Sequence, residues 1–218
     1  MHYKFGVCRS EVTALSEYRE TENFCLRQKD KQGIGNIDRA KMIYTRKYSS
    51  PIGGILLAAD DVGLTGLWFD GEKYFADNLP AEHTDKETPI LAETVRWLDI
   101  YFGGEEPDFM PPLHPIGSEF RQEVWKILLR IPYGKTVTYG DISRQLAKKT
   151  GVEKMSAQAV GGAVGHNEIS IIIPCHRVVG TGGSLTGYAG GIDKKIRLLE
   201  LEHADMSRLF VPKKGTAL

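Results

Sequence analysis

The residues best suited to covalent chemistry lie at Cys175 and His176. Cys175 follows an apolar, largely β-branched run, Ile169–Ile173, and then Pro174. The thiolate is the nucleophilic form of cysteine, so a nearby base must take the thiol proton, and the imidazole of His176 is a candidate. Adjacent side chains of an extended segment point to opposite faces, so contact between them requires a tight turn or a bridging water. A buried, inert cysteine is the alternative, and these two residues alone do not exclude it.

The cysteine count limits the other chemistry that the chain can support. Among 218 residues there are three cysteines, Cys8, Cys25 and Cys175. This odd, sparse count argues against a disulfide scaffold, and without a CxxC pair a structural zinc site is not expected. We therefore expect no metal, no cofactor and a reducing compartment. Because we find neither a signal-peptide pattern nor an apolar run long enough to span a bilayer, we expect a cytoplasmic protein without membrane contact.

Charge is distributed unevenly along a chain whose formal net charge is zero. Residues 1–114 have six more acidic than basic residues, whereas residues 115–218 have six more basic than acidic residues. Such an asymmetry suggests that the C-terminal half meets a polyanion. On this signal alone, chance composition is the better explanation.

The first half of the chain predicts a small sheet and one helix. Residues 1–41 are polar without a sustained apolar period and are expected to be a disordered leader, with at most a weak helix near Val12–Tyr18. Three short apolar segments separated by tight turns predict an antiparallel meander at residues 42–48, 54–59 and 64–69.

Thr88 and Pro89 are typical of a helix start, and apolar residues then recur at helical spacing as far as Gly103-Gly104. The segment 105–115 contains four prolines and no periodicity, which predicts a linker between two halves.

The second half predicts short helices around one buried segment. Ser118 can cap a helix that ends before Pro132. Residues 138–147 and 156–164 predict two helices on either side of a polar turn. This pattern fits a helix-turn-helix, and a plain helical hairpin, which is commoner among proteins, is the alternative. Small residues on the second of these helices would let its backbone approach a partner, either DNA or another helix. The run Ile169–Ile173 predicts a short buried strand, and Asp193 can cap a last helix.

The full string Ile173–Val178, with the sequence IPCHRV, resembles the active-site signature of the O6-alkylguanine-DNA alkyltransferases, also called methylated-DNA–protein-cysteine methyltransferases. The likeness continues at Phe120–Gln122 with Trp125, at Ala159–Ala163 and at Gly187–Gly191. It covers roughly residue 42 to the C-terminus and is strong from residue 120 to residue 202. Several motifs in the right order and spacing make this signal specific.

The resemblance implies direct-reversal DNA repair, in which Cys175 takes the alkyl group from O6-alkylguanine, and from O4-alkylthymine, in one turnover and becomes S-alkylcysteine. It implies that His176 is the general base, acting through a water, and that Glu202 orients this imidazole. Asn167 matches the asparagine that braces the turn carrying the active site. Tyr139 matches the tyrosine that helps rotate the damaged nucleotide outward and contacts the flipped base.

The resemblance also implies the substrate contacts and the partner. The backbone near Val178 and Ala189 would hydrogen-bond the edge of guanine, and Tyr188 would line the pocket. The partner would be double-stranded DNA carrying alkylated bases, bound through the minor groove with base flipping by a monomeric protein. The residues expected to contact DNA are Gln158, Ala159, Gly161, Gly162 and Arg177.

One residue departs from the family pattern. Family members often have an arginine that intercalates where the base has left the stack, and Gln158 stands at that position. Glutamine fills space and forms hydrogen bonds but carries no charge. We therefore expect flipping to persist with reduced DNA affinity and reduced salt dependence.

The expected fold class is α/β: an N-terminal α/β domain on a small antiparallel sheet, and a mainly helical C-terminal domain with a helix-turn-helix. The expected boundaries are a leader at 1–41, the N-terminal domain and linker at 42–114, the alkyltransferase domain at 115–205 and a tail at 206–218.

Two other functions remain open at this point. A lesion-binding relative without repair activity would lack the acceptor, so the presence of Cys175 and Glu202 argues against it. A cysteine hydrolase would need an oxyanion hole and a thioester that water can cleave. Turnover separates the three functions, because a binder has none, an alkyltransferase has one and a hydrolase has many.

Overall fold

The computed structural model describes residues 42–213. The leader predicted at residues 1–41, including the weak helix near Val12–Tyr18, lies outside the described residues. Within the described range, no helix has the length and apolar character that crossing a membrane requires.

A small sheet forms the first part of the described chain. Strands β1 (Tyr44–Ser50), β2 (Gly53–Ala59) and β3 (Leu64–Phe69) are successive antiparallel neighbours, which confirms the predicted meander. The short strand β4 (Thr84–Asp85) adds to β1 in parallel and was not predicted, because two residues carry no detectable alternation.

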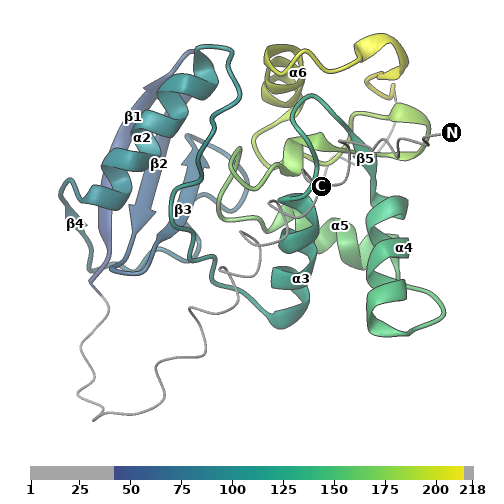
Figure 1. The fold of residues 1–218 in the computed structure, drawn as a ribbon, viewed down its shortest axis with the longest axis horizontal. Helices are drawn as coiled ribbons and strands as arrows, with labels where there is room; N and C mark the ends of the chain where they lie inside the picture. Colours follow the sequence, from purple (N-terminus) through teal and green to yellow (C-terminus); the bar gives the residue numbers. More distant parts are fainter. Residues whose placement is uncertain (1–41, 214–218) are drawn as a thin grey trace, which may run out of the picture. The chain divides into compact units, whose positions relative to one another are not determined.

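Helix α2 (Pro89–Phe102) packs against this sheet (Figure 1). Its predicted start is confirmed, since the Thr88 side chain accepts a hydrogen bond from the Leu91 N–H at 3.3 Å and Pro89 occupies the first helical position. We call residues 42–115 the sheet half and residues 116–213 the helical half.

The proline-rich linker covers part of the outer edge of β3. The Leu64 N–H donates to Pro112 O, and the His114 N–H donates to Leu64 O, both at 2.7 Å. The His114 Nδ1 atom also lies 2.7 Å from the Asp60 carboxylate. An unpaired edge strand exposes polar backbone groups, so this pairing both satisfies the edge and fixes the linker to the sheet.

The rest of that edge pairs with the segment that precedes Cys175. The Leu67 N–H donates to Glu168 O at 2.8 Å, and the Ser170 N–H donates to Leu67 O at 2.9 Å. Backbone hydrogen bonds therefore attach the turn that carries the candidate nucleophile to the edge of β3.

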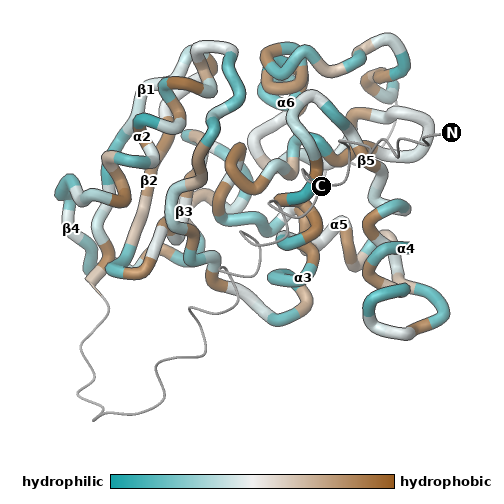
Figure 2. Tube along the Cα trace, viewed as in Figure 1, coloured by the Kyte–Doolittle hydropathy of each residue, from teal (hydrophilic) through white to brown (hydrophobic). Residues whose placement is uncertain are grey.

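Three helices of the helical half pack on one another (Figure 1): α3 (Glu119–Leu128), α4 (Tyr139–Thr150) and α5 (Ala157–Gly165). A hydrophilic turn joins α4 to α5, as Figure 2 shows, and this arrangement confirms the predicted helix-turn-helix. Hydroxyl side chains cap the three helix starts, at Ser118, Thr138 and Ser156.

Shorter elements connect the helices to the candidate nucleophile. Strand β5 (Val137–Thr138) leads directly into α4 and pairs in parallel with β6 (Val178–Val179), which follows the 3₁₀ turn η1 (Cys175–Arg177). A second 3₁₀ turn, η2 (Thr181–Gly183), follows β6.

Two local predictions for this region are wrong. Residues 169–173 form a turn rather than a strand, since Ile171 has a φ of 70° and Ile169 makes only an isolated bridge to Leu67. The β-branched composition favoured a strand, but side-chain hydrogen bonds from Asn167 close the segment into a turn. Helix α6 (Ile192–Leu201) begins after Gly191, so Asp193 lies inside its first turn instead of capping it.

The chain after α6 folds back onto the loop after β6. It includes a 3₁₀ turn, η3 (Met206–Arg208). The Leu185 N–H donates to Phe210 O at 2.8 Å, and the Phe210 N–H donates to Gly183 O at 3.1 Å. The start of the segment predicted as a tail is therefore paired with the body of the protein.

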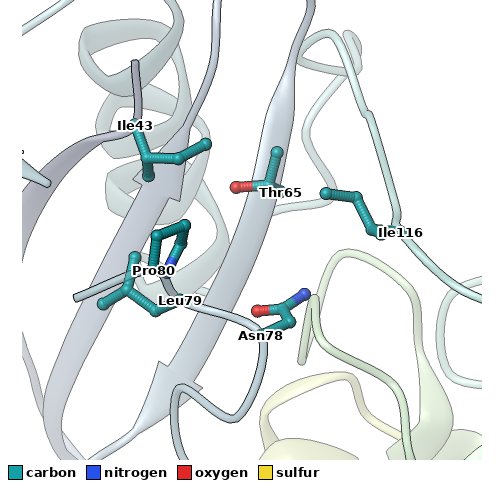
Figure 3. Close-up of a pocket in the computed structure, with 6 residues that line it drawn as sticks. All are labelled: Ile43, Thr65, Asn78, Leu79, Pro80 and Ile116. Atoms are coloured by element: carbon teal, nitrogen blue, oxygen red, sulfur yellow. The ribbon is translucent and has the colours of Figure 1, made fainter. Parts of the chain in front are cut away.

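One continuous hydrophobic core joins the two halves. It includes sheet residues such as Leu57 and Leu67 and helical residues such as Trp125 and Val160, all nearly or fully buried. Trp125 also donates its indole N–H to Ala163 O at 2.9 Å, which ties α3 to α5. A separate small hollow of about 130 Å³ lies beside the sheet (Figure 3), and none of the predicted site residues lines it: Ile43, Thr65, Asn78, Leu79, Pro80 and Ile116.

Replacing Thr138 by alanine tests the start of α4, from which Tyr139 is presented. The Thr138 hydroxyl accepts from the Asp141 N–H at 3.1 Å, and the Asp141 carboxylate accepts from the Thr138 N–H at 2.9 Å. We expect Thr138→Ala to lower the free energy of unfolding by about 1 kcal/mol, because one helix N–H loses its acceptor. Urea unfolding measures this loss; Thr138→Ser should stay close to the unsubstituted protein, and an unchanged alanine variant would contradict the cap.

Candidate active site

Cys175 is buried and lies at the first position of a 3₁₀ turn. Cys175 is 4% exposed, and its Sγ atom accepts a hydrogen bond from the Asn167 amide at 3.1 Å. Because Cys175 and His176 lie in a turn, the opposite-face constraint of an extended segment does not apply to them. No direct hydrogen bond joins the thiol to the imidazole among the residues that the structure describes.

Asn167 closes the turn that precedes the thiol. Its side-chain N–H groups lie 3.2 Å from Ile169 O and 2.8 Å from Ile173 O, and its Oδ1 atom accepts from the Ile169 N–H at 3.1 Å. The side chain thus connects both ends of the turn to the sulfur atom. The predicted bracing position of Asn167 agrees with this geometry.

Glu202 is a buried carboxylate that accepts hydrogen bonds from several elements. His176 Nε2 lies 2.6 Å from Oε1, and the Tyr101 hydroxyl donates to the same oxygen at 2.7 Å. Arg177 donates Nε to Oε2 at 2.8 Å and Nη2 to Oε1 at 3.0 Å, and the Gly134 N–H donates to Oε2 at 3.2 Å. Residues that are far apart in the sequence therefore converge on one side chain.

These contacts keep Glu202 ionised and His176 neutral. Burial alone would raise the pKa of Glu202, but the hydrogen bonds and charges of His176 and Arg177 outweigh burial and hold this pKa at about 2. Burial lowers the pKa of His176, and the Arg177 charge lowers it further against the opposing effect of Glu202. Because Arg177 supplies the balancing positive charge, the imidazole can remain an uncharged base.

The imidazole has one nitrogen available for proton transfer. An ionised carboxylate only accepts hydrogen bonds, so the Nε2 atom that faces Glu202 carries the proton and Nδ1 has a free lone pair. Nδ1 is buried and has no hydrogen-bond partner among the described residues. Burial, opposed by Asn167, raises the pKa of Cys175 to about 11, so the resting residue is a thiol. A buried thiol therefore lies one residue from a buried neutral base.

Tyr139 faces the loop after β6. Its hydroxyl donates to Gly187 O at 3.1 Å and lies 3.4 Å from Thr186 O. Burial raises the pKa of Tyr139 well above its usual range, and the nearby Cys175 raises it further. The phenol consequently keeps its proton and lies close to both the loop and the sulfur atom.

The three residues predicted to contact the substrate lie in the same region. The carbonyl oxygens of two of them already accept hydrogen bonds from other residues of the chain. Val178 O accepts from the Lys195 ammonium at 2.5 Å, and Ala189 O accepts from the Lys73 N–H at 3.0 Å. The Tyr188 ring stands edge-on to the His176 imidazole, with the ring centroids 6.4 Å apart. The Tyr188 hydroxyl is buried, and a side-chain hydrogen bond with Ser170 opposes the increase that burial causes in the pKa of Tyr188.

The predicted DNA contacts on α5 form one surface. Gln158 and Ala159 are exposed, and Gly161 and Gly162 are half-buried. A Cβ atom added at Gly162 would meet nothing within 4 Å, and one at Gly161 would meet only the Tyr139 ring, at 3.9 Å. Packing within the chain therefore does not explain why this helix carries two adjacent glycines.

Arg177 is not part of that surface. Its guanidinium donates to Glu202 and also to Ile131 O at 2.6 Å, and its side chain is only 11% exposed. Its predicted DNA contact is unsupported by this geometry, because the donors that would bind phosphate are already used inside the protein.

Sequence reasoning did not identify three residues that build the site. Tyr101 was expected to be part of an ordinary helix, and Lys195 gave no signal, although its ammonium is completely buried and bound to Val178 O and Thr186 O. Gly134 lies just beyond the helix end predicted before Pro132 and gave no sign of a contact with the site. It has a φ of 67°, and a Cβ atom there would lie 2.5 Å from Glu202 O, so glycine is required for the close approach of this loop.

The sequence matches two described protein families in tandem. Residues 43–115 match the "6-O-methylguanine DNA methyltransferase, ribonuclease-like domain", and residues 119–204 match the "6-O-methylguanine DNA methyltransferase, DNA binding domain".

Individual relatives give the same result. The chain is 43% identical to a methylated-DNA–protein-cysteine methyltransferase of Mycobacterium leprae over 74% of this chain and 93% of the relative. It is 46% identical to one of Methanosarcina acetivorans over 73% of this chain and 98% of the relative. A crystal structure of Mycobacterium tuberculosis OGT in complex with DNA is similar, with a TM-score of 0.64, 42% identity and coverage of 76% of this chain and 94% of that chain.

Matches at this identity and coverage, in a chain whose buried cysteine lies beside a His–Glu pair, show that the protein belongs to the methylated-DNA–protein-cysteine methyltransferase family.

Proposed function

We propose that the protein repairs DNA by direct reversal, moving a methyl or larger alkyl group from O6-alkylguanine to Cys175. The observation that carries this proposal is the buried Cys175 thiol, held by Asn167 next to a neutral His176 whose Nδ1 atom is free. Family membership supplies the reaction class, since the curated relatives are named methylated-DNA–protein-cysteine methyltransferases.

The bonds and protons of the transfer can be accounted for without a cofactor. His176 Nδ1 takes the thiol proton through a water molecule, and a sulfur lone pair attacks the alkyl carbon. The bond between this carbon and guanine O6 breaks, and its electron pair stays on guanine, which takes up a proton. The product is a thioether on Cys175, and Cys175 is the single cysteine in residues 42–213, so no second thiol in that range can attack it. One turnover per protein molecule follows.

Tyr139 and the loop around Tyr188 supply the contacts to guanine in this proposal. The raised pKa of Tyr139 keeps its proton in place, so the hydroxyl can donate to the departing base. The inserted base replaces the present bond from Tyr139 to Gly187 O. Val178 and Ala189 border the base with their backbone in this proposal. O4-alkylthymine presents the same type of alkyl–oxygen bond and remains an expectation.

The exposed side of α5 is the proposed DNA surface. Its two glycines leave room for a DNA backbone or base edge to approach the helix closely, and Gln158 takes the place of a flipped nucleotide in the stack. A hollow of about 630 Å³ next to the start of α5 is lined partly by the basic residues Arg144 and Lys154. A duplex bound through its minor groove would place phosphates near these two side chains.

We also propose the domain limits and location that the sequence predicts. Matches at 43–115 and 119–204 support an N-terminal domain and linker at 42–114 and an alkyltransferase domain at 115–205. The thiol must stay reduced to act and its substrate is DNA, which supports the cytoplasm as the location. One chain holds Cys175, His176 and Glu202 together, which is consistent with a monomer as the working form. Arg177 has a structural task in this proposal, as the counter-charge of Glu202.

Mass analysis tests the acceptor directly. After incubation with a duplex containing O6-methylguanine, we expect the Cys175 peptide to gain the mass of one methyl group, and undamaged DNA should give no change. Cys175→Ala should bind the duplex but remove no methyl group. An unmodified Cys175 in folded protein would refute the function, and more than one repaired base per molecule would favour a hydrolase.

We expect the charge of Arg177 to extend the reaction to lower pH, because it lowers the pKa of the base His176. Removing it with Arg177→Leu raises the pKa of His176, so that the imidazole becomes protonated, and useless as a base, at a higher pH. We expect the single-turnover rate of this variant, as the pH is lowered from neutral, to start falling at a higher pH than the rate of the unsubstituted protein.

Two controls accompany this experiment. Arg177→Lys retains a positive charge and should shift the profile less, and Arg130→Leu removes an exposed arginine from the end of α3 and should not shift it. Superimposable pH profiles for Arg177→Leu and the unsubstituted protein would contradict the role of Arg177.

Adding charge at Gln158 tests the DNA surface. Gln158→Arg should tighten binding to duplex DNA and steepen the dependence of log K on log salt concentration by about one unit, because one more phosphate is neutralised. Ala81→Arg adds the same charge at an exposed residue before β4 and should leave the slope unchanged. Equal slopes for both variants, measured by titration at several salt concentrations, would place the DNA elsewhere.

A further inference from the structure

We propose that Glu72, in the sheet half, is a positioning residue for the transfer: it holds the turn that carries Cys175 in register with the substrate loop 187–191. This inference rests on the proposed function of Cys175. It assigns the sheet half a direct task in the chemistry of the helical half.

Glu72 contacts the Cys175 turn through Ser170. The residue is 6% exposed and lies just after β3. Its Oε2 atom accepts from the Phe69 N–H at 3.0 Å and from the Ser170 hydroxyl at 3.3 Å. Ser170 is completely buried and also donates its N–H to Leu67 O. The turn is therefore attached to the sheet half by its backbone and by a side chain.

The residue after Glu72 contacts the other side of the site. The Lys73 N–H donates to Ala189 O at 3.0 Å, in the substrate loop. A Cβ atom at Gly190 would lie 3.4 Å from the Phe69 ring, and the Lys194 ammonium lies 5.6 Å from the centroid of that ring. The short segment 69–73 thus touches both the turn with the nucleophile and the loop that borders guanine. Its conformation sets the spacing between them.

The Glu72 carboxyl group also influences the charge around the sulfur atom. Burial, together with the charge of Glu168, raises the pKa of Glu72 to about 8, against the opposing effects of the bonds from Phe69 and Ser170 and of the charge of Lys194. Glu72 is therefore mainly uncharged at neutral pH. When ionised, it raises the pKa values of both Cys175 and Tyr188. A neutral Glu72 provides hydrogen-bond acceptance without disfavouring the thiolate.

The neighbouring buried carboxyl group of Glu168 offers a matched control. Glu168 is also 6% exposed, but it accepts from the Trp68 indole N–H at 2.8 Å rather than from Ser170. It is not among the groups that shift the pKa of Cys175. Glu168→Gln therefore makes the same chemical change in the same region without altering the Ser170 contact.

The first measurement is the single-turnover rate of methyl transfer from an O6-methylguanine duplex at neutral pH, with duplex affinity measured separately. Glu72→Gln keeps an acceptor oxygen for Phe69 and Ser170, so we expect a rate within about twofold of the unsubstituted protein. Glu72→Ala removes the acceptor and should slow transfer about tenfold with unchanged duplex affinity, because the thiol and the base lose their alignment. If Glu72→Ala does not fold, Ser170→Ala breaks the same contact and should slow transfer in the same way.

The second measurement separates this task from simple stabilisation. The ultraviolet absorbance of the thiolate, taken as the difference from a Cys175→Ser variant, gives the pKa of Cys175 without DNA. We expect Glu72→Gln to lower this pKa, because the carboxylate that forms at high pH is gone, and Glu168→Gln to leave it unchanged.

Unchanged transfer in folded Glu72→Ala, or equal thiol pKa values in Glu72→Gln and the unsubstituted protein, would overturn the inference while leaving the proposed function intact. Failure of the unsubstituted protein to accept any methyl group would instead overturn both.

Discussion

The site depends on one buried negative charge, the carboxylate of Glu202. Moving an isolated carboxylate into a protein interior is costly, and here the cost is offset by donors from Tyr101, Gly134, His176 and Arg177. Because these donors come from α2, the loop before β5 and the η1 turn, while Glu202 itself follows α6, the charge fixes how the elements meet. It also fixes the imidazole tautomer, which leaves Nδ1 free to act as a base. Arg177 balances the charge, and the imidazole consequently need not be protonated.

The thiol is presented by a strained turn rather than by a regular strand. Ile171 is β-branched and adopts a φ of 70°, which costs about 1–2 kcal/mol relative to a right-handed conformation. The hydrogen bonds of Asn167 and the pairing of Ser170 with β3 hold the segment in this conformation. A turn places Cys175 and His176 at adjacent positions of a 3₁₀ helix, an arrangement that an extended chain does not provide.

The two halves of the described chain contribute different things to the proposed repair reaction. The helical half carries the nucleophile, the base and the exposed face of α5, where neighbouring glycines leave space for a duplex. The sheet half supplies the β3 edge and the segment 69–73. Both contact the Cys175 turn, and the segment 69–73 also contacts the substrate loop. A net charge of zero is compatible with DNA binding because the proposed contact is local, and the basic residues Arg144 and Lys154 lie beside the start of α5.

Features that depend on short-range patterns could be predicted from the sequence. The caps at Thr88 and Ser118, the meander and the helix-turn-helix follow from local backbone preferences and apolar spacing, and the ordered motifs around Cys175 identified the family. Which distant groups meet is set by the folded structure. Tyr101 reaches Glu202 across 101 positions and Glu72 reaches Ser170 across 98, and no local pattern distinguishes such residues from ordinary core or surface positions. The same holds for residues 169–173, where hydrogen bonds from Asn167 outweigh the preference of β-branched residues for a strand. It also holds for Arg177, whose guanidinium binds Glu202 and Ile131 inside the protein.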